Sequence, residues 1–232
     1  MSLDESPDAK TGDKRRNTQR AALLDAASEM LMRGGPDAIS LRKLAAKVGT
    51  STMAVYTAFG GKDGLITGLF NEAFDRLAAA QNAVPRSPEP LLWLEGLGRA
   101  YRRFALDNPS YYALMISVTM PVSEAMRHEV LASDLPARGI SHHAAYRRLF
   151  EAVQACKDEG SFSADVDTML IADAFWSTVH GLCSLELAGF YASAEAAQAR
   201  FGFTCFAVMR GLLTEKGLAR FASLANLDPA KR

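Results

Sequence analysis

Residues Ser40 to Lys62 read SLRKLAAKVGTSTMAVYTAFGGK, and this stretch decides the fold. It predicts two short helices, 41–47 and 51–57, that are separated at Gly49, a residue that adopts the left-handed conformation of a helix end without strain. Ser40 is expected to cap the first helix through its hydroxyl. Two short helices joined in this way form a unit that fits the major groove of DNA.

The rest of the chain also reads as helix, because no stretch alternates apolar and polar residues with the period of a strand. We therefore predict an all-α fold. Residues 1–16 are expected to be a disordered tail, 17–80 a DNA-binding domain and 81–232 a second helical domain, with a corner at the proline-rich segment 84–90. The further helices are expected at residues 17–33, 62–81, 90–107, 109–117, 121–132, 137–160, 165–190, 194–215 and, as a short final helix, from 217.

Positive charge is concentrated near the start of the chain, although the net charge of the whole is zero. Residues 14–62 hold nine Lys or Arg against three acids, whereas residues 63–232 hold 16 basic and 19 acidic side chains. A basic segment on a mildly acidic remainder favours a phosphate-binding module. The alternative, which the charges alone leave open, is that these basic residues form a solvated face that binds no phosphate.

The sequence lacks the residue patterns that are typical of zinc-binding proteins, enzymes and membrane or secreted proteins. Cys156, Cys183 and Cys205 lie far apart in apolar helical patterns, and no Cys/His spacing resembles a zinc site. No nucleophile and base arrangement stands out, so we expect no enzyme, no cofactor and no metal. The polar N-terminus does not resemble a signal peptide and no apolar run is long enough to span a membrane, so a cytoplasmic location is expected.

The outer face of the second short helix is the candidate recognition surface. It carries small or hydroxyl side chains, which approach a base edge or phosphate closely, and its free N–H groups attract phosphate. On the preceding helix, Arg42 and Lys43 could reach the DNA backbone, and Arg42 could bond guanine. The alternative is that these are ordinary capped helices and that Tyr56 belongs to the core.

Residues 17–77 resemble the N-terminal domain of the tetracycline-repressor (TetR) family of transcriptional regulators. The resemblance is carried by ISLRKLA at 39–45, VGTS at 48–51, AVY at 54–56 with Phe59, and KDGL at 62–65. It implies a three-helix DNA-binding domain in which Ser40 caps a helix, and Tyr56 and Lys62 bind phosphates. The residues expected to face the bases or the nearby DNA backbone are Arg42, Thr52, Met53, Ala54 and Thr57. Thr50 and the pair Gly60-Gly61 depart from the usual pattern, which predicts a looser corner and a less rigid approach to Lys62.

The C-terminal half contains Trp176, His180 and Gly181, which resemble the Trp-x-x-x-His-Gly signature of one subclass of TetR-type C-terminal domains. Trp176 and His180 share a helix face and could line an effector pocket. Alternatively, His180 bonds a buried carbonyl while Gly181 allows two helices to cross closely. The family's habit of binding small effectors suggests a mostly apolar pocket, lined by Trp93, Phe104, Tyr111, Tyr112, Met115, Phe150, Trp176 and His180, although such residues could equally form plain core.

The last two long helices are apolar on more than one side, so something must bury them. The resemblance implies a homodimer that pairs through these helices, here through Leu182, Leu185, Phe206, Met209 and Leu213. It further implies a repressor that a small-molecule effector releases from a pseudo-palindromic double-stranded DNA operator. The competing hypothesis is a helical small-molecule-binding protein without operator function.

Overall fold

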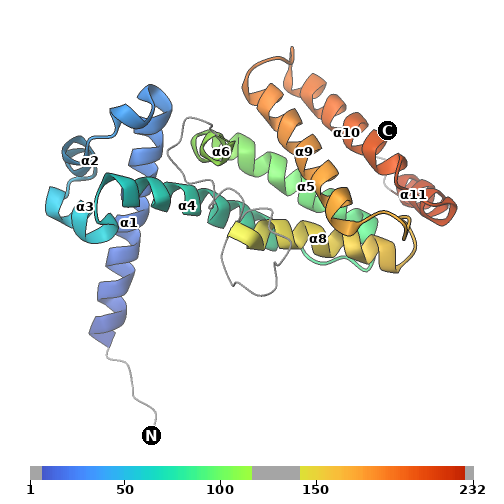
Figure 1. Ribbon diagram of the computed structural model, residues 1–232, viewed down its shortest axis with the longest axis horizontal. Helices are drawn as coiled ribbons and strands as arrows, with labels where there is room; N and C mark the ends of the chain where they lie inside the picture. Colours follow the sequence, from blue (N-terminus) through green and yellow to red (C-terminus); the bar gives the residue numbers. More distant parts are fainter. Residues whose placement is uncertain (1–6, 117–141, 228–232) are drawn as a thin grey trace, which may run out of the picture. The chain divides into compact units, whose positions relative to one another are not determined.

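The computed structural model describes residues 7–116 and 142–227, and Figure 1 shows these as helices joined by short connections. The all-α prediction is confirmed, since the only strand-like pairing among these residues is a bridge between Phe162 and Leu213. The helix expected at 121–132 and the first residues of the one expected at 137–160 lie outside the described residues. None of the described helices is both long and apolar enough to cross a membrane.

The chain divides into two compact units, and the first boundary between them falls inside helix α4 (Lys62–Asn82). The first unit comprises Met1–Ala73 with Ser110–Arg127. The second unit comprises Phe74–Pro109 with His128–Arg232.

The first unit is built from α1 (Pro7–Gly34), the 3-10 turn η1 (Pro36–Ala38), α2 (Leu41–Val48), α3 (Thr52–Phe59), the first part of α4, and α6 (Pro109–Ile116). Its core buries Leu24, Leu44 and Val55 completely. This matches the apolar spacing of the sequence, because α1 packs on α2 and α2 on α3. The hydroxyl of Tyr111 on α6 donates to Asp25 on α1 at 2.9 Å, which ties α6 to this unit.

The predicted start of the first helix is wrong. Helix α1 begins at Pro7, ten residues before the expected Asn17, so most of the segment expected to be a disordered tail is helical. Proline suits the first helical position, because the N–H that it lacks would have had no partner there. The residues that follow, up to Arg16, include several good helix formers, which extend the helix toward its start.

The second unit contains the last part of α4 with α5 (Pro90–Asp107), α8 (His142–Asp158), α9 (Thr168–Leu187), α10 (Ala194–Arg210) and α11 (Glu215–Leu227). Helices α5, α8 and α9 pack on one another, and their shared core includes Leu97, Val153 and Ile171. Asp167 caps α9 by accepting from the amide of Met169 at 2.7 Å. The segment between α9 and α10 ends at the α10 cap, Ser193.

The helix predicted for 194–215 ends five residues early, and the short final helix predicted from 217 is α11. Helix α10 ends at Arg210, and α11 starts at Glu215. The intervening residues leave the helix to pair with the loop before α9, where the amide of Thr214 donates to the Ser161 carbonyl at 2.9 Å. Helix α11 then packs on α10, with the rings of Phe206 and Phe221 stacked 4.8 Å apart.

Candidate nucleic-acid interface and ligand cavity

Side-chain and backbone caps define the two short helices. The Ser40 hydroxyl accepts from the amide of Lys43 at 3.4 Å and starts α2. Gly49 ends α2 with φ of 70°, and Ser51 starts α3 by accepting from the amide of Ala54 at 3.1 Å. The cap predicted at Ser40 and the left-handed corner predicted at Gly49 are both confirmed.

One face of α3 is buried and the other is open. Val55 is the fully buried residue of this helix, whereas Met53 is 72% exposed and Tyr56 is 51% exposed. Arg42 and Thr57 are also exposed, and Thr52, Ala54, Ser40 and Lys62 are half-buried. The alternative that Tyr56 is a core residue is therefore wrong, and all the residues predicted for DNA contact retain accessible surface.

Residues of α1 that the sequence motif did not indicate hold this surface in place. The side-chain amide of Gln19 donates to the Thr50 hydroxyl at 2.7 Å. Thr50, which departs from the usual family pattern, is therefore held to α1 by a hydrogen bond. The guanidinium of Arg20 lies 4.9 Å from the centre of the Phe59 ring, at the end of α3. Lys47 on α2 forms an ion pair with Glu29 at 2.6 Å and lowers the pKa of that carboxyl.

Helix α4 begins in close contact with the end of α3. A Cβ on Gly64 would lie 1.8 Å from the carbonyl oxygen of Phe59, so only glycine fits at this position. This approach sets where α4 starts relative to α3, and Lys62 is the first residue of α4.

The second unit contains a hollow of about 2000 Å³ that is partly open to solvent. Residues from α4, α5, α8, α9, α10 and α11 line it, and most of this surface is apolar. Of the residues predicted for an effector pocket, Phe104 and Trp176 lie on its wall. Tyr111, Tyr112 and Met115 belong to the first unit instead.

Trp93, Phe150 and His180 belong to the second unit, but they do not lie on the wall of this cavity. Trp93 is buried in the core, with the guanidinium groups of Arg86 and Arg148 at 5.1 and 5.0 Å from its ring. Phe150 is half-buried on α8. The sequence showed how often large side chains recur, but it did not show which side of each helix faces the cavity.

His180 is joined to the cavity wall through Tyr101. Its Nδ1 lies 2.7 Å from the hydroxyl of Tyr101, and its ring stacks on Trp176 with centroids 5.4 Å apart. Burial lowers the pKa of His180 to about 4, so the ring is neutral at physiological pH. Gly181 is exposed, and a Cβ on it would meet no described atom within 4 Å, so it does not mark a close helix crossing within the described chain.

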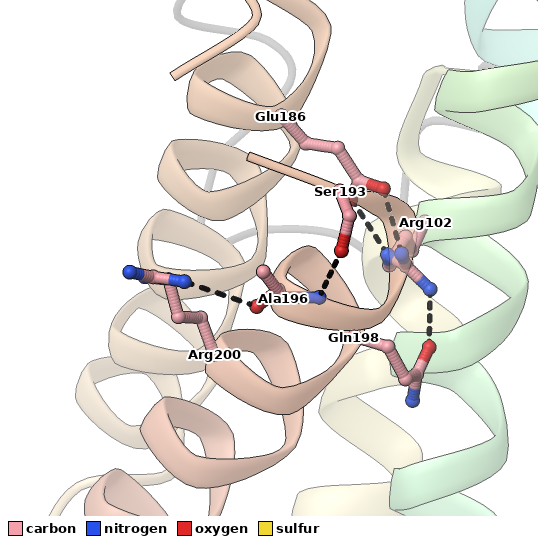
Figure 2. A network of polar contacts seen from close by, with 6 residues as sticks. All are labelled: Arg102, Glu186, Ser193, Ala196, Gln198 and Arg200. Atoms are coloured by element: carbon pink, nitrogen blue, oxygen red, sulfur yellow. Dashed lines mark hydrogen bonds and ion pairs between the residues drawn. The ribbon is translucent and has the colours of Figure 1, made fainter. Parts of the chain in front are cut away.

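Arg102 connects three helices of the second unit, as Figure 2 shows. From α5 it donates to both carboxylate oxygens of Glu186 on α9, at 2.7 and 2.6 Å, and to Gln198 on α10 at 2.5 Å. Its guanidinium also lies 5.4 Å from the centre of the Phe201 ring. The Arg102 and Glu186 side chains are only 15% and 13% exposed, and no signal in the sequence pairs residues this far apart.

Helices α9 and α10 each leave an apolar face uncovered. Leu170 and Leu185 on α9 are 64% and 43% exposed, and Phe203 on α10 is 74% exposed. Of the other residues predicted for a dimer interface, Leu182 and Met209 are buried within the chain itself, and Phe206 and Leu213 are half-buried. Met209 in particular is part of the hydrophobic core, so it offers little surface to a second chain.

No group of metal-binding side chains occurs in the part of the chain that the structure describes. Comparison with curated proteins finds no significant match. Residues 23–69 match the family of bacterial regulatory proteins called the tetR family. Residues 94–208 match the tetracyclin repressor-like C-terminal domain, so the two matches together span more than half of the chain.

Three solved structures illustrate the likeness in fold. A protein of unknown function from Rhodococcus sp. RHA1 is 24% identical, with a TM-score of 0.64 over 84% of this chain and 96% of that chain. A putative regulatory protein is 27% identical, with a TM-score of 0.61 over 84% and 97% of the two chains. The TetR family transcriptional regulator PfmR from Thermus thermophilus is 21% identical, with a TM-score of 0.62 over 83% and 99%.

Proposed function

Because the chain belongs to the TetR family of DNA-binding transcriptional regulators, we propose that it is a repressor that binds a pseudo-palindromic operator as a homodimer. A small-molecule effector in the second unit would release it from the DNA. Its Trp176, His180 and Gly181 further suggest the Trp-x-x-x-His-Gly subclass of the C-terminal domain.

The observation that carries this proposal is the open face of α3. Thr52, Met53, Ala54 and Thr57 lie on or beside this face, where a major groove could receive them with Arg42. The proposed phosphate contacts are Tyr56 and Lys62, and the role of Ser40 is to start α2 at the correct residue. Since most of the affinity would come from phosphates, binding is expected to fall steeply with salt.

The test is a gel-shift assay on the DNA upstream of the gene for this chain. Arg42→Ala and Tyr56→Ala are each expected to weaken binding by about tenfold, because each removes a contact worth roughly 1–3 kcal/mol. Arg147→Ala is the matched control, since Arg147 is an exposed arginine of the second unit. If the parent chain binds none of this DNA, the competing hypothesis of a small-molecule-binding protein without operator function is favoured.

We propose that the dimer forms through the uncovered faces of α9 and α10, on which Leu185 and Phe203 are exposed. Gly181 and Gly202 lie on the same two helices with open space where a Cβ would stand, which permits close approach of a second pair of helices. Phe203→Glu is expected to yield monomers in analytical ultracentrifugation, whereas Leu106→Glu, at an exposed leucine of α5, is expected to leave the dimer intact.

We propose that the effector binds in the cavity of the second unit against Phe104 and Trp176. Its effect on DNA binding would be a population shift, whose size equals the difference in its affinity for the DNA-bound and released states. A native mass measurement of the purified dimer would show a bound molecule directly. An effector that lowers operator affinity must itself be bound less tightly by the operator complex.

A further inference from the structure

We propose that the inner wall of this cavity binds an uncharged, mostly apolar molecule that carries a hydroxyl or amide N–H group, and that Gln81 accepts a hydrogen bond from that group. The inference rests on the proposed effector function, because it names the chemical class of ligand for the same cavity. Four features of the second unit support it.

The first feature is the division of the cavity lining by helix α5. Leu97, Tyr101 and Phe104 recur at helical spacing on one face, which we call the inner wall. Five charged residues of α5 also belong to the lining. Asp107 lies in the last turn of the helix, and Glu95, Arg99, Arg102 and Arg103 lie on the side away from the inner wall, since each residue advances by about 100°. Arg99 and Arg102 are already engaged, Arg99 with Glu95 at 2.6 Å and Arg102 with Glu186.

The second feature is the absence of charge from the residues that α8 and α9 add to the lining. Helix α8 contributes Ala145, Tyr146 and Leu149, and α9 contributes Phe175, Trp176 and Val179. No Lys, Arg, Asp or Glu occurs among these lining residues. A charged ligand group would therefore lose its hydration at this wall without meeting an opposite charge, which is strongly unfavourable.

The third feature is Gln81, which shares a face of α4 with Leu77 and lines the cavity. The Gln81 side chain is almost completely buried at 5% exposure, yet its Oε1 has no hydrogen-bond partner among the described residues. A buried amide oxygen in this state costs folding free energy. A ligand hydroxyl or N–H would supply the missing donor.

The fourth feature is that the remaining polar groups of the wall are neutral. The Tyr101 hydroxyl is joined to His180, whose ring is uncharged because burial lowers its pKa to about 4. The Tyr146 hydroxyl donates to Asp173, and burial with this carboxylate raises the pKa of Tyr146. Neither of these two pairs supplies a cation, so neither would stabilise an anionic ligand.

The test compares three probes that share a twelve-carbon chain and differ in the head group: dodecan-1-ol, dodecanoate and protonated dodecylamine. Binding to the purified full chain is followed by tryptophan fluorescence, to which Trp176 on the cavity wall contributes, and by the rise in Tm. The alcohol is expected to bind at least about tenfold more tightly than either charged probe. Equal or tighter binding of a charged probe, or no binding of the alcohol, overturns the inference.

Two variants then test the role of Gln81. Gln81→Leu is expected to weaken dodecan-1-ol binding by about fivefold, since it removes the proposed acceptor. Gln154→Leu is the matched control, because Gln154 is a glutamine of α8 in the same unit that bonds Thr168 and Asp158 and does not line the cavity. Unchanged alcohol binding by Gln81→Leu, or an equal loss in Gln154→Leu, overturns the assignment of Gln81.

The comparison of head groups needs only the parent chain, so it holds even if Gln81→Leu does not fold. A gel-shift assay on the same preparation separates the two proposals. A parent chain that binds the operator but prefers a charged probe contradicts the ligand class alone. A parent chain that prefers the alcohol but binds no operator contradicts the repressor function alone.

Discussion

Replacing Arg102 by methionine is expected to destabilise the second unit strongly. The change keeps most of the side-chain length but removes both hydrogen bonds to Glu186 and the one to Gln198. Glu186 would then keep its negative charge at only 13% exposure without its cation. Breaking a buried pair in this way typically costs about 3–5 kcal/mol, because the charge that remains is desolvated and uncompensated.

We expect the lower end of that range, about 3 kcal/mol, because both side chains retain some exposure to water. For a chain of 232 residues this corresponds to a fall in Tm of roughly 6–12 °C. The double variant Arg102→Met with Glu186→Leu removes both charges together. It is expected to lie within about 1 kcal/mol of the parent, since apolar residues of similar volume can replace a buried pair.

The assay is urea unfolding of the parent, both single variants and the double variant, followed by far-UV circular dichroism. Arg99→Met is the matched control. Like Arg102, Arg99 is an arginine of α5 that pairs with a glutamate, here Glu95, but its side chain is 53% exposed. It is expected to change the free energy of unfolding by less than about 0.5 kcal/mol. A loss below about 1 kcal/mol in Arg102→Met, or no recovery in the double variant, would refute the reasoning.

Three further predictions concern the DNA-binding domain and His180. Lys62→Ala is expected to reduce the salt slope of operator binding by about one, measured by fluorescence anisotropy at several salt concentrations, and an unchanged slope would argue against a phosphate contact. Gly64→Ala is expected to destabilise the first unit by at least about 2 kcal/mol, because its Cβ would clash with the Phe59 carbonyl; a Tm equal to that of the parent would contradict this. The folded-state pKa of His180, about 4, is below its unfolded value of 6.5, so the unfolded chain binds the additional proton between these values. Stability is therefore expected to fall by about 2 kcal/mol from pH 7 to pH 4.5 in urea titrations, and His180→Gln should lose this part of the pH dependence.

The sequence was sufficient for features that depend on a few neighbouring residues. The cap at Ser40 and the left-handed Gly49 could be predicted because a cap or a corner is formed by residues within about four positions of one another. The limits of α2, α3, α4 and α5 agree with the predicted ones to within two residues. The early start of α1 and the early end of α10 at Arg210 were missed, because the first lacks a strong local signal and the second depends on pairing with Ser161.

The exposed face of α3 could also be predicted from the sequence, since a short amphipathic helix with one buried residue, Val55, must expose its other side. The cavity of the second unit could not. Its wall combines residues of six helices, and the sequence could not show that Tyr111 and Phe104 belong to different units. The partners of Tyr101 and Arg102 lie 79 and 84 residues away, respectively.

By itself, then, the sequence determined the two short helices, their caps at Ser40 and Gly49, and the exposed residues of α3, because these follow from local hydrogen bonding and from the period of the helix. Only the tertiary structure decided which face of α5 lines the cavity, which charges are paired, and where Gln81 leaves a buried oxygen without a described partner. Those outcomes depend on how distant helices pack, and packing is set by the whole set of side chains at once.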